Sequence, residues 1–168
     1  MFDRKQPAFE RLVRAYSPEL YRYAYWLCHD RCVAEDLVQE TFTRAWGAWA
    51  GLREEAAARK WLYTILHNEH ARLFERKRLD IVDDQDLDAL EAEPSADSQR
   101  DIAMREALHA LPESYREPLL LQVLGGFSCQ EIASLMNMTE GAVMTRLSRA
   151  RLALRRGISG RDSKQASA

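Results

Sequence analysis

The stretch SCQEIASLMNMTEGAVMTRLSRARLALRR, residues 128–156, decides the fold of the C-terminal half of this chain. Ser128 and Glu131 have the spacing of a capping box, which predicts a helix start, and apolar residues then recur at helical spacing. Asn137 marks a reversal, because asparagine tolerates the left-handed conformation better than most residues. Thr139 is placed to cap a second helix. The stretch therefore predicts two helices joined by a tight turn.

The second of these helices has two different faces. Its apolar residues recur at three and four residues and predict a buried face: Ala142, Val143, Leu147, Ala150 and Leu154. Its other face is rich in arginine: Arg146, Arg149, Arg151, Arg155 and Arg156. A merely solvated face usually mixes lysine, glutamate and arginine, whereas here Glu140 is the only acid. The pattern favours a helix-turn-helix whose second helix enters the DNA major groove; the alternative is a helical hairpin with a solvated arginine face.

The net charge of -2 over 168 residues hides a segregation of charge along the chain. Residues 1–78 hold 14 Lys/Arg and 11 Asp/Glu (net +3), residues 79–101 hold 1 and 9 (net -8), and residues 102–168 hold 9 and 6 (net +3). Two mildly basic blocks flank an acidic strip, so local patches matter more to a polyanion than the total. With no leader and no long apolar run, we expect a cytoplasmic protein that does not insert into a membrane, with its 3 cysteines reduced.

Helical periodicity recurs along the chain, and no stretch alternates as a strand would. Ser17-Pro18 resembles the start of a new helix, so the first apolar stretch is predicted as two helices that meet there. Helices are predicted at residues 6–16, 18–29, 33–48, 56–78, 98–110 and 112–124. In the last of these, Tyr115, Leu119, Leu120 and Val123 are the predicted core face.

The predicted fold class is all-α, with two small helical domains joined by a flexible acidic linker and the helix-turn-helix in the C-terminal domain. The acidic stretch contains Pro94 and has little periodicity, which is typical of a linker. The predicted divisions are a domain at 1–78, the linker at 79–98, a domain at 99–157 and a frayed tail at 158–168.

Three runs resemble conserved segments of the extracytoplasmic-function sigma factors, small bacterial subunits of RNA polymerase of the sigma-70 superfamily. AEDLVQETFTRAW, residues 34–46, is similar to the family's polymerase-binding helix, and WLYTILHNEHARLFERKR, residues 61–78, to its promoter-melting helix. LPESYREPLLLQVLGGFSCQEIASLMNMTEGAVMTRLSRARLAL, residues 111–154, resembles its second conserved domain. The resemblance implies a protein without catalysis or cofactor, whose partners are RNA polymerase core, promoter DNA and a membrane-anchored anti-sigma factor.

The resemblance also implies three groups of site residues. The group for core polymerase is Asp36, Gln39, Glu40, Phe42 and Trp46. The group for the minus-ten element is Leu52, Arg53, Arg59, Lys60 and Asn68. The group for the minus-thirty-five element is Met144, Thr145, Arg146, Ser148, Arg149, Arg151 and Arg155. Relatives often carry an aromatic residue at Leu52 and Arg or Lys at Met144.

Several of these residues have a second interpretation. Phe42 and Trp46 fit core packing equally well, and Arg53, Arg59 and Lys60 fit an ordinary basic surface. The run Arg76–Arg78 is a further candidate for phosphate contacts.

Two alternative functions stay open from the sequence. A free-standing helix-turn-helix regulator explains the C-terminal half and leaves the N-terminal motifs unexplained. A metal- or redox-sensing module would use Cys28, His29 and Cys32, although their C-x3-C spacing is not the usual one for zinc. No set of residues for catalysis stands out.

Overall fold

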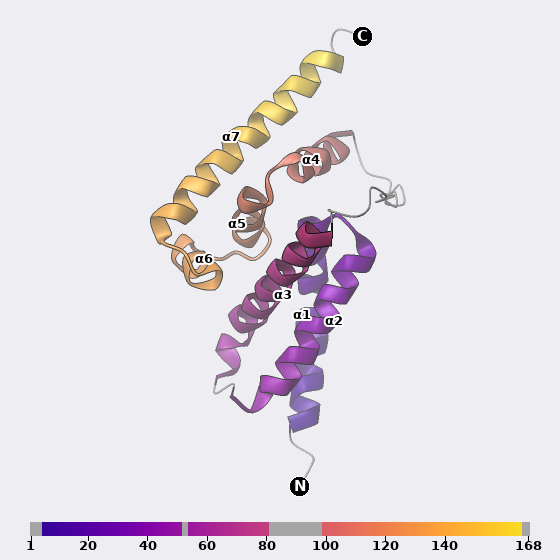
Figure 1. Cartoon of the computed structure of the whole chain (residues 1–168), viewed down its shortest axis with the longest axis vertical. Coiled ribbons are helices and arrows are strands. Elements are labelled where there is room, and N and C mark those ends of the chain that lie inside the picture. Colours follow the sequence, from indigo (N-terminus) through magenta and orange to yellow (C-terminus); the bar gives the residue numbers. More distant parts are fainter. Residues whose placement is uncertain (1–4, 52–53, 81–98, 166–168) are drawn as a thin grey trace. The chain divides into compact units, whose positions relative to one another are not determined.

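The computed structural model describes residues 5–51, 54–80 and 99–165, and every regular element in these ranges is a helix (Figure 1). The chain divides into two compact units, one on each side of residue 90. The predicted all-α class with two helical domains is confirmed. The predicted linker falls mostly on residues 81–98, which lie outside the described residues, so its boundaries stay a prediction.

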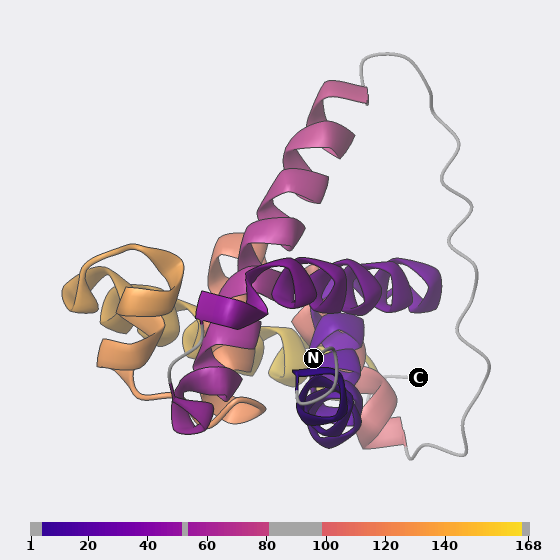
Figure 2. The ribbon, with the colours of Figure 1, turned by 90° about the horizontal axis from the view of Figure 1, so that it is seen from below.

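The first unit consists of three long helices: α1 (Lys5–Cys28), α2 (Arg31–Ala48) and α3 (Ala58–Asp80). Two short 3-10 helices, η1 (Trp49–Gly51) and η2 (Glu55–Ala57), lie between α2 and α3. The helix α2 packs against both α1 and α3 (Figure 2). The core side chains are fully buried and come mainly from α1 and α3: Leu20, Tyr23, Leu27, Leu62, Tyr63 and Leu66.

The predicted break at Ser17-Pro18 is wrong, because α1 runs through Pro18 as one helix. Proline removes one helical hydrogen bond and usually disrupts a helix interior. Here the buried residues on the two sides, Leu12 and Leu20, lie on one helical stripe that continues to Leu27, so a single face packs against α2. This packing outweighs the local cost of the proline.

The structure also shifts other boundaries in the first unit. Asp30 caps α2, its carboxylate accepting the Val33 N–H at 3.0 Å, so α2 starts earlier than the predicted residue 33. The buried face of this helix consists of Leu37, Val38, Thr41, Phe42 and Ala45. The helix α3 starts at Ala58, two residues after the predicted start, and its buried residues include the polar side chains of Tyr63 and His70.

The second unit contains α4 (Gln99–Ala110), α5 (Glu113–Val123), α6 (Cys129–Met136) and α7 (Glu140–Gln165). Arg116 links α5 to the end of α4. Its guanidinium donates hydrogen bonds to the backbone oxygens of Leu108, His109 and Leu111 at 3.0, 2.6 and 2.8 Å. The last carbonyls of a helix lack intrahelical donors, and Arg116 supplies donors there; the Leu108 oxygen also accepts the Leu111 N–H at 3.2 Å. Between α5 and α6 the backbone passes so close to Gly125 that a Cβ there would lie 2.5 Å from the Leu121 oxygen.

The helix-turn-helix is confirmed in its local details. The Glu131 N–H donates to the Ser128 hydroxyl at 3.1 Å and the Ser128 N–H to the Glu131 carboxylate at 3.2 Å, which completes the capping box. Asn137 is left-handed, with φ 53° and ψ 52°. The Thr139 hydroxyl accepts the Ala142 N–H at 3.2 Å at the start of α7.

Two predictions in this unit need correction. Val123 was placed in the core of α5 but is 68% exposed, whereas Leu121 is fully buried. Leu119 and Leu120 of the same predicted face are buried, so the error is limited to Val123 and the omission of Leu121. The predicted frayed tail after Gly157 is also wrong as a structural description, because α7 continues to Gln165.

Candidate functional site

A polar strip runs along the exposed side of α2. Asp36, Gln39 and Glu40 are all exposed, and their spacing of three and four residues places them on one face of the helix. The structure thus brings together the three polar residues that the sequence assigned to polymerase binding.

The two aromatic residues assigned to the same site differ in exposure. Phe42 is buried and packs edge-on against Phe9 of α1, with ring centroids 6.4 Å apart. Trp46 is 49% exposed, and its ring centroid lies 5.0 Å from that of Phe9. Phe42 is therefore a core residue beneath α2, and of the two only Trp46 presents a surface to a partner.

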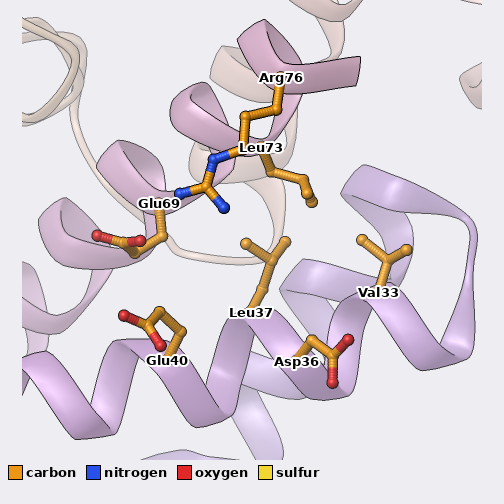
Figure 3. A pocket seen from close by; sticks show the side chains of 7 residues that line it. All are labelled: Val33, Asp36, Leu37, Glu40, Glu69, Leu73 and Arg76. Atoms are coloured by element: carbon orange, nitrogen blue, oxygen red, sulfur yellow. The ribbon is translucent and has the colours of Figure 1, made fainter. Parts of the chain in front are cut away.

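Between α2 and α3 lies a groove of about 340 Å³ (Figure 3). Its apolar lining is Val33 and Leu37 of α2 with Leu73 of α3. Its charged lining is Asp36, Glu40, Glu69 and Arg76. The two acids of the polar strip are thus also groove residues, so the strip and the groove form one continuous surface.

A network of ion pairs holds the two walls of this groove together. Arg44 of α2 contacts Glu40 at 3.1 Å and Glu69 of α3 at 2.5 Å, and Arg72 contacts Glu69 at 3.1 Å. Glu69 is only 5% exposed, so this pairing compensates a carboxylate that would otherwise be costly to bury. The sequence analysis did not identify this network; the Glu40–Arg44 and Glu69–Arg72 spacings were its only local signals.

The residues assigned to minus-ten DNA are not gathered into one described site. Leu52 and Arg53 lie outside the described residues. Asn68 is exposed on α3, and Lys60 is half-buried. The side chain of Arg59 joins α3 to α1: its Nε donates to the Glu19 carboxylate at 2.6 Å, and its guanidinium lies 5.3 Å from the centre of the Tyr63 ring. Burial and the nearby Glu19 carboxylate raise the pKa of Tyr63, which keeps its hydroxyl protonated.

The residues assigned to minus-thirty-five DNA lie along α7. Six of them are exposed: Met144, Thr145, Ser148, Arg149, Arg151 and Arg155. Arg146 is half-buried at the edge of this face. Arg151 donates a hydrogen bond to the side-chain oxygen of Gln122 in α5, and the Thr145 hydroxyl donates to the Gly141 oxygen at 3.0 Å.

Leu152 also belongs to this exposed face and was missed. It is 49% exposed and follows Ser148 and Arg149 by four and three residues, so it lies beside them on the helix. The spacing alone would have placed it there. An apolar side chain among arginines suits contact with a base or with an apolar partner residue.

The cysteine cluster has no geometry of a metal site. Cys28 is half-buried, Cys32 is exposed, and His29 packs near the Tyr25 ring at 6.0 Å. Across the ranges that the structure describes, no three His, Cys, Asp or Glu residues are grouped as metal ligands. Within the same ranges no helix has the length and apolarity needed to cross a membrane.

Comparison with known protein families gives two matches, one in each unit. Residues 12–79 match the family model described as Sigma-70 region 2. Residues 101–154 match the model described as Sigma-70, region 4. The first covers all of α2 and the groove, and the second covers the helix-turn-helix and α7 as far as Leu154.

Individual relatives extend these matches over most of the chain. It is 34% identical over 160 residues (89% of this chain) to the probable RNA polymerase sigma factor RfaY of Xanthomonas campestris, and 36% identical over 148 residues (82%) to the ECF RNA polymerase sigma factor BldN of Streptomyces coelicolor. It spans only 40% and 55% of these two relatives. It is 30% identical over 142 residues to the ECF RNA polymerase sigma factor EcfG of Rhodopseudomonas palustris, covering 83% of this chain and 78% of that one.

A solved structure has the same fold over nearly the whole chain. It is the sigma factor RpoE in complex with the anti-sigma factor NepR from Bartonella quintana, with a TM-score of 0.78, 28% identity, and coverage of 90% of this chain and 97% of that one. The structure of CnrH in complex with the cytosolic domain of CnrY gives a TM-score of 0.66 at 25% identity, covering 92% and 90%.

Proposed function

Because this chain belongs to the extracytoplasmic-function sigma factors of the sigma-70 superfamily, we propose that it binds RNA polymerase core, directs it to specific promoters and assists DNA melting. The observation that carries the proposal is that two chemically different exposed surfaces occur on separate units: a mixed-charge strip and groove on α2 and α3, and an arginine-rich face on α7.

The polymerase-binding surface is formed by Asp36, Gln39 and Glu40, with Trp46 at its edge. Charged residues fix the register of a protein interface, and a large aromatic side chain supplies buried area. All four side chains are exposed. Phe42 supports this surface from the core.

The DNA-binding surface is the exposed face of α7. Arg149 has the two-donor guanidinium that suits a guanine edge, while Arg151 and Arg155 suit phosphates. Thr145 and Ser148 add single hydrogen bonds, and Met144 suits a thymine methyl group.

In the first unit the Asn68 amide suits an unpaired minus-ten base, and Lys60 suits a phosphate. Arg59 is a weaker candidate, because Glu19 and Tyr63 already engage it.

Regulation by an anti-sigma factor completes the proposal. The related sigma factor from Bartonella quintana was solved with such a partner, the anti-sigma factor NepR. We expect an anti-sigma factor of this chain to cover the α2 surface and the second unit, so that polymerase and inhibitor compete. Action on polymerase and DNA places the protein in the bacterial cytoplasm.

The direct test is a titration of purified protein against bacterial RNA polymerase core, with Asp36→Arg as the variant. The wild type should bind tightly, and Asp36→Arg should lose at least about tenfold in affinity, because it sets a like charge against a partner that complements an acid. Asp36 is exposed, so far-UV circular dichroism should show unchanged helix content. A folded wild type that does not bind core would overturn the proposal in favour of a free-standing DNA-binding regulator.

A second experiment separates the two surfaces. Duplexes are first selected from a random library by the wild-type holoenzyme, and Arg149→Gln is then compared with wild type on them. The variant should bind core normally and lose roughly 5- to 150-fold in DNA affinity, the range for a bidentate base contact. Normal DNA affinity would show that Arg149 does not read a base. Asp36→Arg is the reciprocal control, because it should lose affinity for core.

A further inference from the structure

The groove between α2 and α3 is electrically polarised. At one end, Glu40 and Glu69 share ion pairs with Arg44 and Arg72. Arg76 also lines the groove (Figure 3), extending from α3 with its guanidinium on the Glu69 side. Three arginines against two glutamates leave one positive charge at this end.

The other end of the groove carries the opposite charge. Asp36 lines it beside Val33, one helical turn before Glu40 (Figure 3). Within the described part of the chain, neither Asp36 nor Arg76 takes part in an ion pair. The apolar side chains of Leu37 and Leu73 lie in the same lining. The groove thus offers one available anion, one available cation and an apolar lining.

We propose that Arg76 is a specificity-determining residue of the polymerase-binding surface, and that the groove takes a helix of polymerase core with complementary polarity. Such a helix would place an acidic side chain at Arg76, an apolar side chain over Leu37 and Leu73, and a basic side chain at Asp36. The inference rests on the proposed function and assigns it a residue beyond the α2 strip. It also removes Arg76 from the phosphate candidates.

Complementarity of this kind sets register. A partner helix with reversed polarity would bring an acid to Asp36 and a base to Arg76, and like-charge contacts at an interface cost several kcal/mol. The Glu69 ion pairs favour this role, because they fix the two walls relative to each other before the partner arrives. A purely acidic strip would attract any basic helix, whereas the polarised groove distinguishes one orientation.

The test is the core-binding titration with Arg76→Glu, Arg76→Gln and Lys77→Glu, performed on the full chain without DNA. Lys77→Glu makes the same charge change one residue away, at an exposed position that does not line the groove. Arg76→Glu should weaken core binding by at least about tenfold, and Arg76→Gln by a smaller factor, because reversal adds repulsion to the loss of attraction. Lys77→Glu should stay within about twofold of wild type, because its side chain is exposed outside the groove lining and its charge is screened by solvent and salt.

The outcomes separate the inference from the function on which it rests. If Arg76→Glu and Lys77→Glu bind core equally well, while Asp36→Arg loses binding, the inference is overturned and the proposed function stands. If folded wild type does not bind core, both are overturned. Circular dichroism checks folding, and if Arg76→Glu is unfolded then Arg76→Gln decides, with wild-type affinity counting against the inference.

Discussion

The α2–α3 groove and the outer face of α7 are both charged, but their charges are organised differently. The groove carries both signs, contributed by two helices and tied by ion pairs that include the buried Glu69. The face of α7 carries one sign from a single helix, and Arg149 pairs with none of the residues that the structure describes. A pattern of both signs can specify one orientation of a protein partner, whereas a uniform basic face suits a polyanion.

This contrast extends to what holds each surface in place. The groove depends on non-local pairing between α2 and α3. The α7 face depends on the apolar residues on the opposite side of the same helix, because Val143, Leu147 and Ala150 are buried against the rest of the second unit. Different substitutions should therefore disturb the two surfaces, and the predictions below test that separation.

The largest effect is expected from Leu147→Ala, which removes a side chain that is 2% exposed beneath the α7 face. The second unit should lose about 2–5 kcal/mol of unfolding free energy, through lost burial and the cavity left behind. Leu152→Ala on the exposed side of the same helix should change it by less than about 0.5 kcal/mol.

The chain provides a convenient measurement, because all 4 tryptophans lie in the first unit. In denaturant, tryptophan fluorescence reports the first unit alone, while far-UV circular dichroism reports both. Leu147→Ala should shift the circular dichroism transition and leave the fluorescence transition in place. A matching shift in fluorescence would show that the two units do not unfold separately. It would contradict the separation of the two surfaces.

A smaller effect is expected from Glu69→Gln in the groove. The substitution removes the charge that Arg44 and Arg72 share. The first unit should lose about 1.5–3 kcal/mol of unfolding free energy, which is the contribution of hydrogen bonds to charged groups. Glu40→Gln, at the exposed end of the same network, should cost less than about 1 kcal/mol. Both are measured by fluorescence-detected unfolding, and equal costs would contradict a groove fixed by its buried carboxylate.

The features that sequence predicted correctly are local ones. The capping box at Ser128, the left-handed Asn137 and the Thr139 cap each involve residues within a few positions of one another, and all three are present. The α7 face was predictable for the same reason, because helical geometry alone assigns residues to the two sides of one helix.

Most of the features that sequence missed depend on distant residues, although Leu152 could have been placed from its helical spacing alone. Ser17-Pro18 has the chemistry of a helix start, and only the unbroken stripe from Leu12 to Leu27 indicates one helix. The pairing of Arg44 with Glu69 spans 25 positions and two helices, so no local pattern contains it. The groove could not be predicted either, because it exists only once α2 packs against α3.

The smallest effect concerns pH and belongs to the second unit. Partial burial, and then the neighbouring Arg116 guanidinium, lower the pKa of His109 below its usual 6.5. The unfolded chain then binds a proton more readily than the folded one, so stability is complete above about pH 6.5 and decreases as pH falls through the lowered pKa. The loss should be small, because His109 remains largely exposed to solvent. The measurement is thermal unfolding by circular dichroism at about pH 7.5 and about pH 5.5 for wild type and His109→Gln. Comparing the two proteins cancels the contributions of the other titrating groups to the pH dependence. Wild type should lose more stability on acidification than the variant; equal losses would mean that Arg116 stabilises the end of α4 through its carbonyl contacts without coupling the second unit to pH.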